Sequence, residues 1–166
     1  MTKEVEFFSL HDLVGSGEEL SVDQLGLKGL LAQSPYAPSL KSVRIFVDEV
    51  IQLERGSPEK KSFYGLRALG EKALLGFAQF RQADEVADLD FIILDENVRG
   101  KGLAKNLLEK SLNCVRLADA KRVMLEVGET NLAAQGLYFY FGFKTISVRK
   151  KYYKGEENAL VMELVL

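Results

Sequence analysis

The sequence predicts an α+β fold in which a mixed, mostly antiparallel sheet is covered by helices. In the middle of the chain a helical pattern separates two apolar strand patterns, 86–94 and 122–127. A strand–helix–strand unit of this kind joins two parallel strands by a right-handed crossover. On both sides of this unit, strand patterns are joined by short polar turns, as in antiparallel hairpins. The length of 166 residues fits a single domain, 1–166.

The first 40 residues show the least regular pattern. Residues 7–13 are consistent with an opening strand and turn. Ser21 and the polar residues after it resemble a capped helix start, and the leucines that follow extend this helix to Leu31. Prolines 35 and 38 interrupt regular structure. The apolar residues of 39–54 are dense enough to predict a largely buried helix.

The remaining elements follow in a regular order. The segments 63–68 and 73–80 predict a hairpin that turns at Gly70-Glu71, and 86–94 predicts the next strand. After a glycine-containing turn, apolar residues recur at helical spacing at Leu103, Leu107, Leu108, Leu112 and Val115. A strand (122–127), a helix (131–141) and two strands joined by 154–158 complete the chain. We therefore expect six or seven strands, a central parallel pair and about four helices.

Composition excludes several kinds of function. Lys and Arg number 22 against 24 Asp and Glu, a net charge of -2, which argues against a nucleic-acid partner. One Cys and one His allow neither an internal disulfide nor a Cys/His metal cage, so we expect no metal. The N-terminus lacks a signal-peptide pattern, and no apolar run reaches the roughly 18 residues of a membrane span. We expect a cytoplasmic protein with no membrane partner, whose chemistry uses carboxylates, phenols, lysines or backbone groups.

Two glycines lie where a strand pattern leads into a helix. The first N–H groups of a helix have no acceptor within the helix, so this turn can receive a phosphate. A dinucleotide-binding motif would need glycine in place of Lys105, and a P-loop would need Ser or Thr after Lys101. The pattern Arg-x-x-Gly-x-Ala is matched in full by Arg99, Gly102 and Ala104. On these residues alone, an ordinary turn that binds nothing is an equal alternative.

The hexapeptide RGKGLA at 99–104, after a strand that ends at Leu94, resembles the pyrophosphate-binding motif of the GNAT superfamily of acyl-CoA-dependent N-acetyltransferases. Later segments are similar in residues and spacing to the RimI group, which acetylates the N-terminal amine of proteins. These segments are Leu125-Glu126-Val127, Asn131, Leu137-Tyr138, Gly142-Phe143, Arg149 with Tyr152-Tyr153, and Ala159 with Met162. The resemblance covers residue 63 to the C-terminus. Residues 1–40 match poorly, and Asn158 stands where RimI-like chains usually have Asp.

The resemblance implies acetyl-CoA as the co-substrate. Backbone groups of one strand would pair with the pantetheine arm and polarise the thioester carbonyl, and a β-bulge would separate this strand from its parallel neighbour. The glycine turn would hold the pyrophosphate. Asn131 would contact the cofactor, cap the last helix, or do both. The expected cofactor-binding residues are Ile92, Ile93, Leu94, Arg99, Gly100, Lys101, Gly102, Leu103, Ala104, Lys105 and Asn131.

Glu126 is the candidate general base. It lies in a strand that we expect to be buried on both faces, an expensive position for an unpaired carboxylate, although a solvated strand end is the alternative. Tyr138, twelve positions later, is the candidate acid. A phenol is protonated at neutral pH and can donate to a departing thiolate. The alternative for Tyr138 is a core aromatic residue.

Tyr36, Tyr152 and Tyr153 are the expected acceptor-binding residues, by resemblance. Neighbouring strand residues point to opposite faces, so at most one of Tyr152 and Tyr153 should face the acceptor if the strand is regular. The reaction expected is direct transfer of an acetyl group to a protein N-terminal α-amine in a ternary complex, by a monomer or homodimer. Acetylation of a small amine on the same fold and a non-catalytic acyl-CoA-binding module are the alternatives.

Overall fold

A computed structural model of the chain describes residues 4–15, 22–51 and 59–166. Its strands are β1 (Val5–Ser9), β2 (Glu59–Ala68), β3 (Leu74–Ala83), β4 (Val86–Leu94), β5 (Arg122–Gly128), β6 (Lys144–Tyr153) and β7 (Glu157–Val165). Its helices are α1 (Leu10–Gly15), α2 (Leu27–Leu31), α3 (Leu40–Ile51), α4 (Leu103–Leu117) and α5 (Leu132–Tyr140), with 3₁₀ turns η1 (Val22–Leu25) and η2 (Glu96–Val98).

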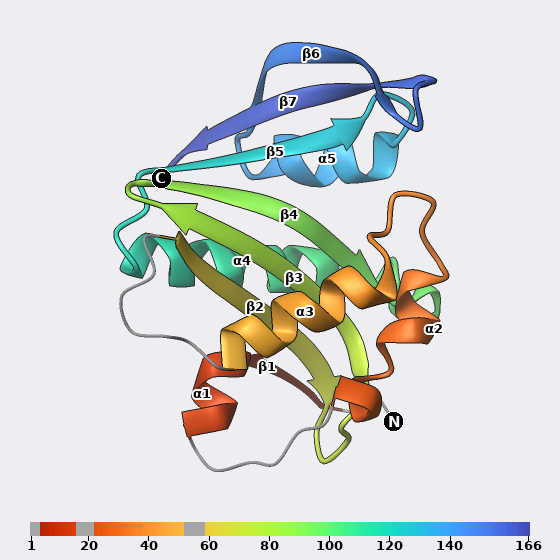
Figure 1. Cartoon of the computed structure of the whole chain (residues 1–166), viewed down its shortest axis with the longest axis vertical. Coiled ribbons are helices and arrows are strands. Elements are labelled where there is room, and N and C mark those ends of the chain that lie inside the picture. Colours follow the sequence, from red (N-terminus) through yellow and green to blue (C-terminus); the bar gives the residue numbers. More distant parts are fainter. Residues whose placement is uncertain (1–3, 16–21, 52–58) are drawn as a thin grey trace.

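The seven strands form one sheet in the order β1-β2-β3-β4-β5-β7-β6 (Figure 1). Every neighbouring pair is antiparallel except β4 and β5, which are parallel and are joined through α4. The predicted α+β class, the mostly antiparallel sheet and its central parallel pair are confirmed. The structure has five α-helices within its described ranges, against about four expected.

The parallel pair is hydrogen-bonded over only half of its length. Pairing runs from Val86↔Arg122 to Leu89↔Leu125 and then ends. In β4 the next residue, Asp90, is an extra residue in the register with β3, where Gln79 faces Phe91 and Phe80 faces Leu89. A β-bulge bends the strand that carries it. The bulge therefore coincides with the point where β4 and β5 separate, as the family resemblance implied.

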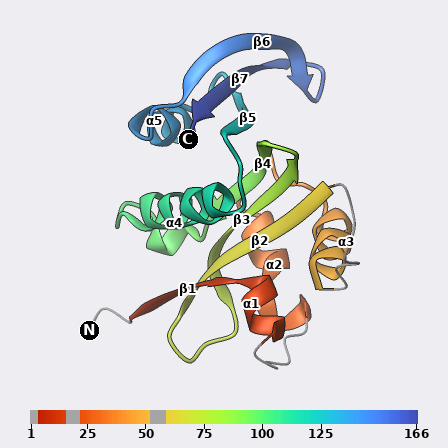
Figure 2. The ribbon, with the colours of Figure 1, turned by 90° about the vertical axis from the view of Figure 1, so that its left-hand side faces the viewer.

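The helices cover both faces of the sheet (Figure 2). On one face α4 packs against the sheet through Leu107, Leu108, Leu112 and Val115, which lie in one core with Phe80 and Met162 among others. On the other face a second core joins α1, α2 and α3 to β2, β3 and β4. The helical spacing of the α4 leucines thus predicted the buried side of this helix correctly.

The N-terminal elements differ from the expectation in two places. The turn expected after the opening strand is the helix α1. Ser21 lies outside the described residues, and the helix expected to continue from it to Leu31 is divided into η1 and α2. The division falls at Gly26, whose φ of 67° is left-handed, a conformation that interrupts a right-handed helix.

The helix expected over 39–54 is observed as α3, and residues 52–54 lie outside the described ranges. It is amphipathic rather than largely buried. Val43 and Val47 are fully buried, whereas Ile45 is 48% exposed. The reason is geometric: α3 covers the sheet as an outer layer, so only one of its faces has a partner (Figure 2).

Candidate active site

A groove of about 670 Å³ lies between the end of β4, the start of α4 and one face of α5. Most of the predicted cofactor residues line it: Ile92, Ile93, Leu94, Arg99, Gly100, Gly102, Ala104 and Lys105. The pairing of β4 with β5 ends at Leu89, so the β4 edge beyond that residue faces the groove side without β5. Backbone groups on such an edge can pair with an extended ligand as an added strand would.

The glycine turn forms one end of this groove. Gly100 and Gly102 have φ values of 74° and 79°, the left-handed region that glycine adopts without steric cost. Gly102 is the N-cap of α4, so the first N–H groups of that helix begin here. A Cβ added at either glycine would meet no atom within 4 Å, because this side of the turn is open. The arrangement can receive an anion at the N-terminus of a 15-residue helix.

Three of the predicted cofactor residues do not line the groove. The Lys101 ammonium donates to the carbonyl oxygen of Asn97 at 3.1 Å, which directs it back onto the turn. Leu103 packs against the core under α4, because it begins the apolar face of that helix. Asn131 lies deeper, beside the catalytic candidates.

Sequence reasoning missed the α5 side of the groove. The residues concerned are Ala133, Ala134, Gly136, Leu137 and Tyr140. Their signal in the sequence is a run of small side chains in a helix, which lets a ligand approach the helix closely. At the mouth of the groove the Lys105 ammonium lies 3.5 Å from the centre of the Tyr140 ring, a cation–π contact that joins α4 to α5.

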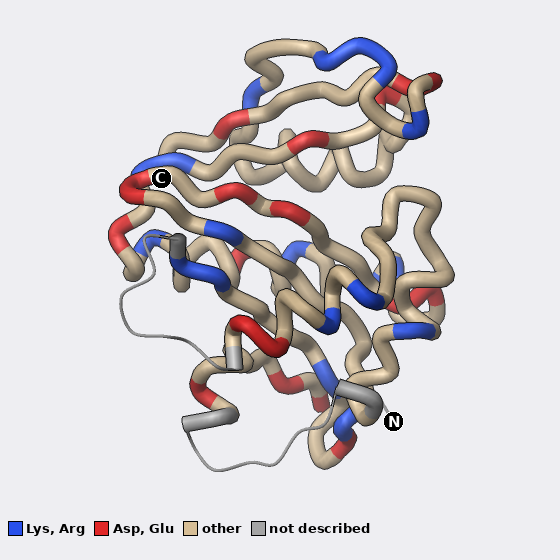
Figure 3. Tube along the Cα trace, in the orientation of Figure 1, with Lys and Arg blue, Asp and Glu red and all other residues tan. Residues whose placement is uncertain are grey.

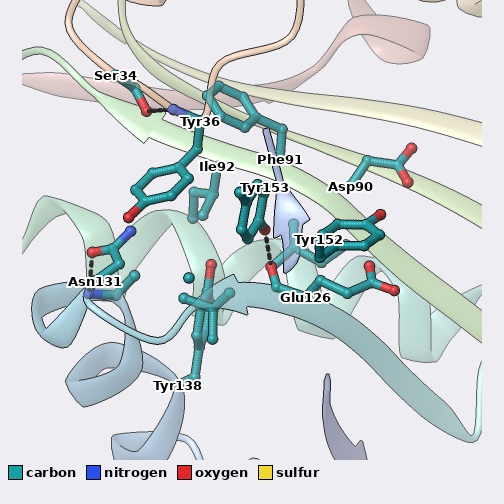
Figure 4. A pocket seen from close by; sticks show the side chains of 14 residues that line it. Ser34, Tyr36, Asp90, Phe91, Ile92, Glu126, Asn131, Tyr138, Tyr152 and Tyr153 are labelled. Atoms are coloured by element: carbon teal, nitrogen blue, oxygen red, sulfur yellow. Dashed lines mark hydrogen bonds between the residues drawn. The ribbon is translucent and has the colours of Figure 1, made fainter. Parts of the chain in front are cut away.

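A smaller cavity of about 180 Å³, here called the inner cavity, lies where β4 and β5 separate (Figure 4). It shares Ile92 and Ala134 with the groove, so the two spaces adjoin. Its lining unites the predicted catalytic and acceptor residues Glu126, Tyr138, Tyr36, Tyr152 and Tyr153 with Asn131. The structure therefore brings together side chains that the sequence distributes over more than a hundred positions.

Glu126 is the first β5 residue beyond the pairing with β4. Its side chain is 30% exposed, so the expectation of burial on both faces is wrong, because the neighbouring strand has already turned away. The carboxylate forms an ion pair with Arg149 of β6, Oε1 to Nη1 at 3.1 Å. Its backbone stays fixed by pairing with Val161 of β7.

Tyr138 packs in the core and also lines the inner cavity. The residue is 6% exposed and its ring packs against Phe143, with 5.6 Å between ring centres. Its hydroxyl points into the inner cavity (Figure 4). Burial, and to a lesser extent the nearby Tyr153, raises the pKa of Tyr138. The hydroxyl is therefore protonated throughout the physiological pH range and available as a hydrogen-bond donor.

Asn131 is the N-cap of α5. Its side-chain oxygen accepts a hydrogen bond from the backbone N–H of Ala134 at 3.2 Å. The same residue lines the inner cavity, so capping leaves it next to the space between groove and catalytic candidates. Capping places the start of α5, and with it the whole α5 wall of the groove, in a defined position.

Both Tyr152 and Tyr153 line the inner cavity, contrary to the expectation for a regular strand. The strand is irregular: Lys151 has a φ of 53°, and the register with β7 shifts between Arg149 and Tyr153. The two rings lie edge to face at 5.1 Å. The Tyr153 hydroxyl donates to the Glu126 carbonyl oxygen at 3.2 Å, and burial raises the pKa of Tyr153 to about 12.

Tyr36 connects the loop after α2 to the C-terminal part of the sheet. Its hydroxyl donates to the Glu157 carboxylate at 3.0 Å, and its ring meets Tyr153 edge to face at 5.0 Å. Glu157 also accepts from the Thr130 N–H at 2.9 Å and hydroxyl at 2.7 Å. Mainly the Thr130 hydrogen bonds, with help from Tyr36, lower the pKa of Glu157. The loop thus forms a fixed wall of the inner cavity.

The side-chain amide of Asn158 donates a hydrogen bond that a carboxylate at this position could not donate. Its Nδ2 donates to Glu129 Oε2 at 2.9 Å, and its Oδ1 accepts from the Lys151 N–H at 3.0 Å. An Asp at this position would face Glu129 with a like charge. The departure from the usual Asp therefore fits the neighbour that this chain carries, and it holds the irregular part of β6 that positions Tyr152 and Tyr153.

Comparison with known proteins agrees with this architecture. Residues 32–143 match the model of the acetyltransferase (GNAT) family, and the chain belongs to that family. A [ribosomal protein bS18]-alanine N-acetyltransferase of Haemophilus ducreyi is 31% identical over 108 residues, which cover 63% of this chain and 74% of the relative.

Two solved structures share the fold. The ribosomal-protein-S18-alanine N-acetyltransferase of Escherichia coli has a TM-score of 0.74 at 22% identity, covering 98% of this chain and 94% of that one. A GNAT acetyltransferase of Elizabethkingia anophelis with acetyl-CoA bound has a TM-score of 0.72 at 14% identity, covering 98% of each chain. The chain is thus a GNAT N-acetyltransferase with acetyl-CoA as its acetyl donor.

Two further findings concern the described residues only. They contain no helix long and apolar enough to cross a membrane. Within the same ranges, no three His, Cys, Asp or Glu side chains converge in a way that could hold a metal ion.

Proposed function

We propose that this enzyme acetylates the N-terminal α-amine of a protein by direct attack on acetyl-CoA in a ternary complex. The observation that carries the proposal is the inner cavity, which adjoins the groove and holds Glu126 and Tyr138 in its lining. The relatives named for alanine acetylation of ribosomal protein bS18 support a protein acceptor, and a cytoplasmic site of action with it.

Binding of the donor uses the groove. The N–H groups at the start of α4 receive the pyrophosphate, and the β4 edge at 92–94 pairs with the pantetheine arm. A backbone N–H of this edge donates a hydrogen bond to the thioester oxygen and stabilises the negative charge that develops there. Since the groove adjoins the inner cavity at Ile92 and Ala134, the acetyl group is presented to the acceptor there.

Proton transfer begins at Glu126. An N-terminal amine has an ordinary pKa of about 7.7 to 8.0, so a large part of it is protonated at neutral pH. The partly exposed carboxylate accepts the proton that the amine must lose, directly or through a water molecule. The nitrogen then attacks the carbonyl carbon, forming the C–N bond and breaking the C–S bond.

Tyr138 acts on the leaving sulfur. Its raised pKa lies above that of an ordinary thiol, about 8.5, so the phenol does not end the reaction ionised. It stabilises the departing thiolate by donating a hydrogen bond, and the proton released by the amine completes the thiol. Packing against Phe143 holds the Tyr138 ring, and with it the donating hydroxyl, in place.

Mass spectrometry of the purified enzyme with acetyl-CoA and two panels of acceptors tests the proposal. One panel contains peptides with free N-termini beside the same peptides with blocked N-termini and a free lysine. The other contains polyamines, aminoglycosides and amino acids. We expect acetylation of free α-amines alone. Turnover of small amines with no peptide product would contradict a protein acceptor, and coenzyme A binding without any transfer would contradict catalysis.

A further inference from the structure

The loop after α2 bridges the two arms of the sheet that separate at the inner cavity. Its residues 33–36, here called the bridging loop, lie between the end of β4 and the start of β7 (Figure 1). Gln33 contacts the segment that follows β4, and Tyr36 contacts Glu157, the first residue of β7. Between these attachments, Ser34 and Tyr36 line the inner cavity (Figure 4). One short loop therefore joins the β4 arm to the β5–β7 arm.

Gln33 makes two hydrogen bonds to the segment after β4. Its Nε2 donates to Asp95 Oδ2 at 3.1 Å, and its Oε1 accepts from the backbone N–H of Glu96 at 2.8 Å. A side-chain amide suits this position because it supplies a donor and an acceptor side by side. Asp95 directly follows Leu94, the last residue of β4. The loop is therefore bonded to the residues that adjoin the proposed donor edge.

Asp95 is held in place by its own hydrogen bonds. Its backbone N–H donates to the carbonyl oxygen of Leu75 on β3 at 2.8 Å. Its Oδ1 accepts from the N–H and Nδ2 of Asn97 at 2.9 and 2.8 Å and so caps η2, which leads into the glycine turn. The Gln33 hydrogen bond, followed by those from Asn97, lowers the pKa of Asp95, which is ionised at neutral pH. The two carboxylate oxygens thus have separate partners, η2 for Oδ1 and the bridging loop for Oδ2.

The bridging loop contains no charged residue (Figure 3). Its polar attachments are hydrogen bonds from neutral side chains to a carboxylate at each end, Asp95 and Glu157. Such charge-assisted hydrogen bonds are stronger than those between neutral groups. Within the loop, the Tyr36 N–H donates to Ser34 Oγ at 3.2 Å, and the N–H of residue 37 donates to the Ser34 carbonyl oxygen at 3.3 Å. A turn closed by both bonds transmits a displacement of Gln33 to Tyr36.

We propose that Gln33 is a positioning residue that sets the distance between the acceptor wall and the donor edge of β4. It acts through the bridging loop, which carries Ser34 and Tyr36 into the lining of the inner cavity. This inference rests on the proposed function. A misplacement of about 1 Å can cost a hundredfold in rate, so a loop released at its Gln33 end should slow transfer although no residue that contacts the reacting atoms has changed.

Gln33→Met in the full chain keeps the length of the side chain and removes both hydrogen bonds. With acetyl-CoA and a peptide that begins with alanine, we expect kcat/KM for the peptide to fall about tenfold, the value of one hydrogen bond to a charged group. The Kd for coenzyme A should stay within about twofold, because Asn97 still binds Asp95 and Lys101 still binds the Asn97 carbonyl oxygen. A peptide kcat/KM within about twofold of the parent would overturn the role of Gln33.

Gln82→Met is the matched control for lost stability. Gln82 of β3 is buried, and its Nε2 donates to the carbonyl oxygens of Asp84 and Ala118 at 3.0 and 2.8 Å. It lines neither the groove nor the inner cavity. This variant also loses two hydrogen bonds, so its Tm should fall while kcat/KM for the peptide stays within about twofold. An equal loss of kcat/KM in the Gln33 and Gln82 variants would show an effect of stability and would overturn the proposal.

An exchange of donor and acceptor tests the position directly. Gln33→Glu places a carboxylate opposite Asp95, and Asp95→Asn places an amide NH₂ opposite that of Gln33, so each single variant loses the hydrogen bond. The double variant Gln33→Glu/Asp95→Asn keeps the net charge and restores the bond with donor and acceptor exchanged. One oxygen at position 33 still accepts from Glu96, and one at position 95 still accepts from Asn97.

We expect each single variant to lose about tenfold in kcat/KM for the peptide, and the double variant to recover to within about threefold of the parent. A double variant no better than the single variants would refute the role of this hydrogen bond. A parent enzyme that acetylates small amines and no peptide would contradict the proposed function instead. The same variants compared on the amine that reacts would then still decide the role of Gln33.

Discussion

The hydroxyl of Tyr138 gives the sharpest test of the mechanism, because Tyr138→Phe removes it and keeps the packed ring. The ring contact with Phe143 persists, and no hydrogen bond among the described residues involves this hydroxyl, so we expect little change in thermal stability. Loss of one positioned hydrogen-bond donor to a developing negative charge costs about 10² to 10³ in kcat. The inner cavity, about 180 Å³, has room for a water molecule to replace the hydroxyl. We therefore expect a loss at the lower end of this range, about a hundredfold in kcat, which corresponds to about 2.7 kcal/mol in activation free energy.

The assay separates chemistry from binding. Steady-state kinetics with a peptide acceptor give kcat, and calorimetry gives the affinity for coenzyme A, which should stay within about twofold. Tyr64→Phe, at a buried tyrosine of β2 that lines neither the groove nor the inner cavity, is the matched control and should retain full kcat. A Tyr138→Phe enzyme with kcat within threefold of the parent would refute the donor role. A parallel loss of coenzyme A affinity would show that Tyr138 serves binding instead.

Three further predictions follow from the site. Gly102→Ala and Gly70→Ala both place a Cβ at a left-handed φ, 79° and 82°, so each should cost about 1–2 kcal/mol of stability. Only Gly102→Ala should also raise KM for acetyl-CoA. Equal KM values for the two variants would exclude the glycine turn as the phosphate site. Glu126→Gln should lower kcat most at pH 6 to 7, where the amine is protonated, and an unchanged pH–rate profile would count against it as base. Tyr36→Phe should lower Tm at pH 7. The pKa of Glu157 is depressed below its ordinary 4.5, so the stability that the Tyr36–Glu157 hydrogen bond provides is present above pH 4.5 and is lost as pH falls through the folded-state pKa. The difference in Tm should therefore vanish in acid, and a difference that persists at pH 2 would contradict this reasoning.

Most residues on the β4 and α4 sides of the groove, the proposed donor site, could be predicted from the sequence because they are close together in the chain. The β4 edge, the glycine turn and the start of α4 are contiguous in the chain, between Ile92 and Lys105. The α5 wall of the groove adds small side chains, and these line the groove only because of the way α5 packs. By contrast, the acceptor side joins Tyr36 to Glu157, which are 121 positions apart. No local pattern encodes such a contact.

Irregular backbone explains most of the remaining differences. Alternation along a strand predicted one acceptor-facing tyrosine, and the left-handed Lys151 turned both toward the cavity. The bulge at Asp90 likewise shifts the alternation of β4, so a polar side chain lines the cavity between α3 and the sheet, where a regular strand would not place it. The residue type of Lys151 does not predict its conformation, because the types that favour a left-handed backbone are Gly and, less strongly, Asn, Asp and His.

The position of Glu126 follows from the separation of β4 and β5 more than from its residue type. On one side, β5 pairs with β7 up to Gly128, and Tyr153 donates to the Glu126 carbonyl, so the backbone is held. On the other side, pairing with β4 has ended one residue earlier, which leaves room for the side chain between the inner cavity and the cavity under α3. A rigid backbone with an accessible carboxylate is what a general base needs, because it must meet the amine without a loss of conformational freedom. Restoring full β4–β5 pairing would close the cavity and bury the carboxylate, so the role proposed for Glu126 depends on the bulge.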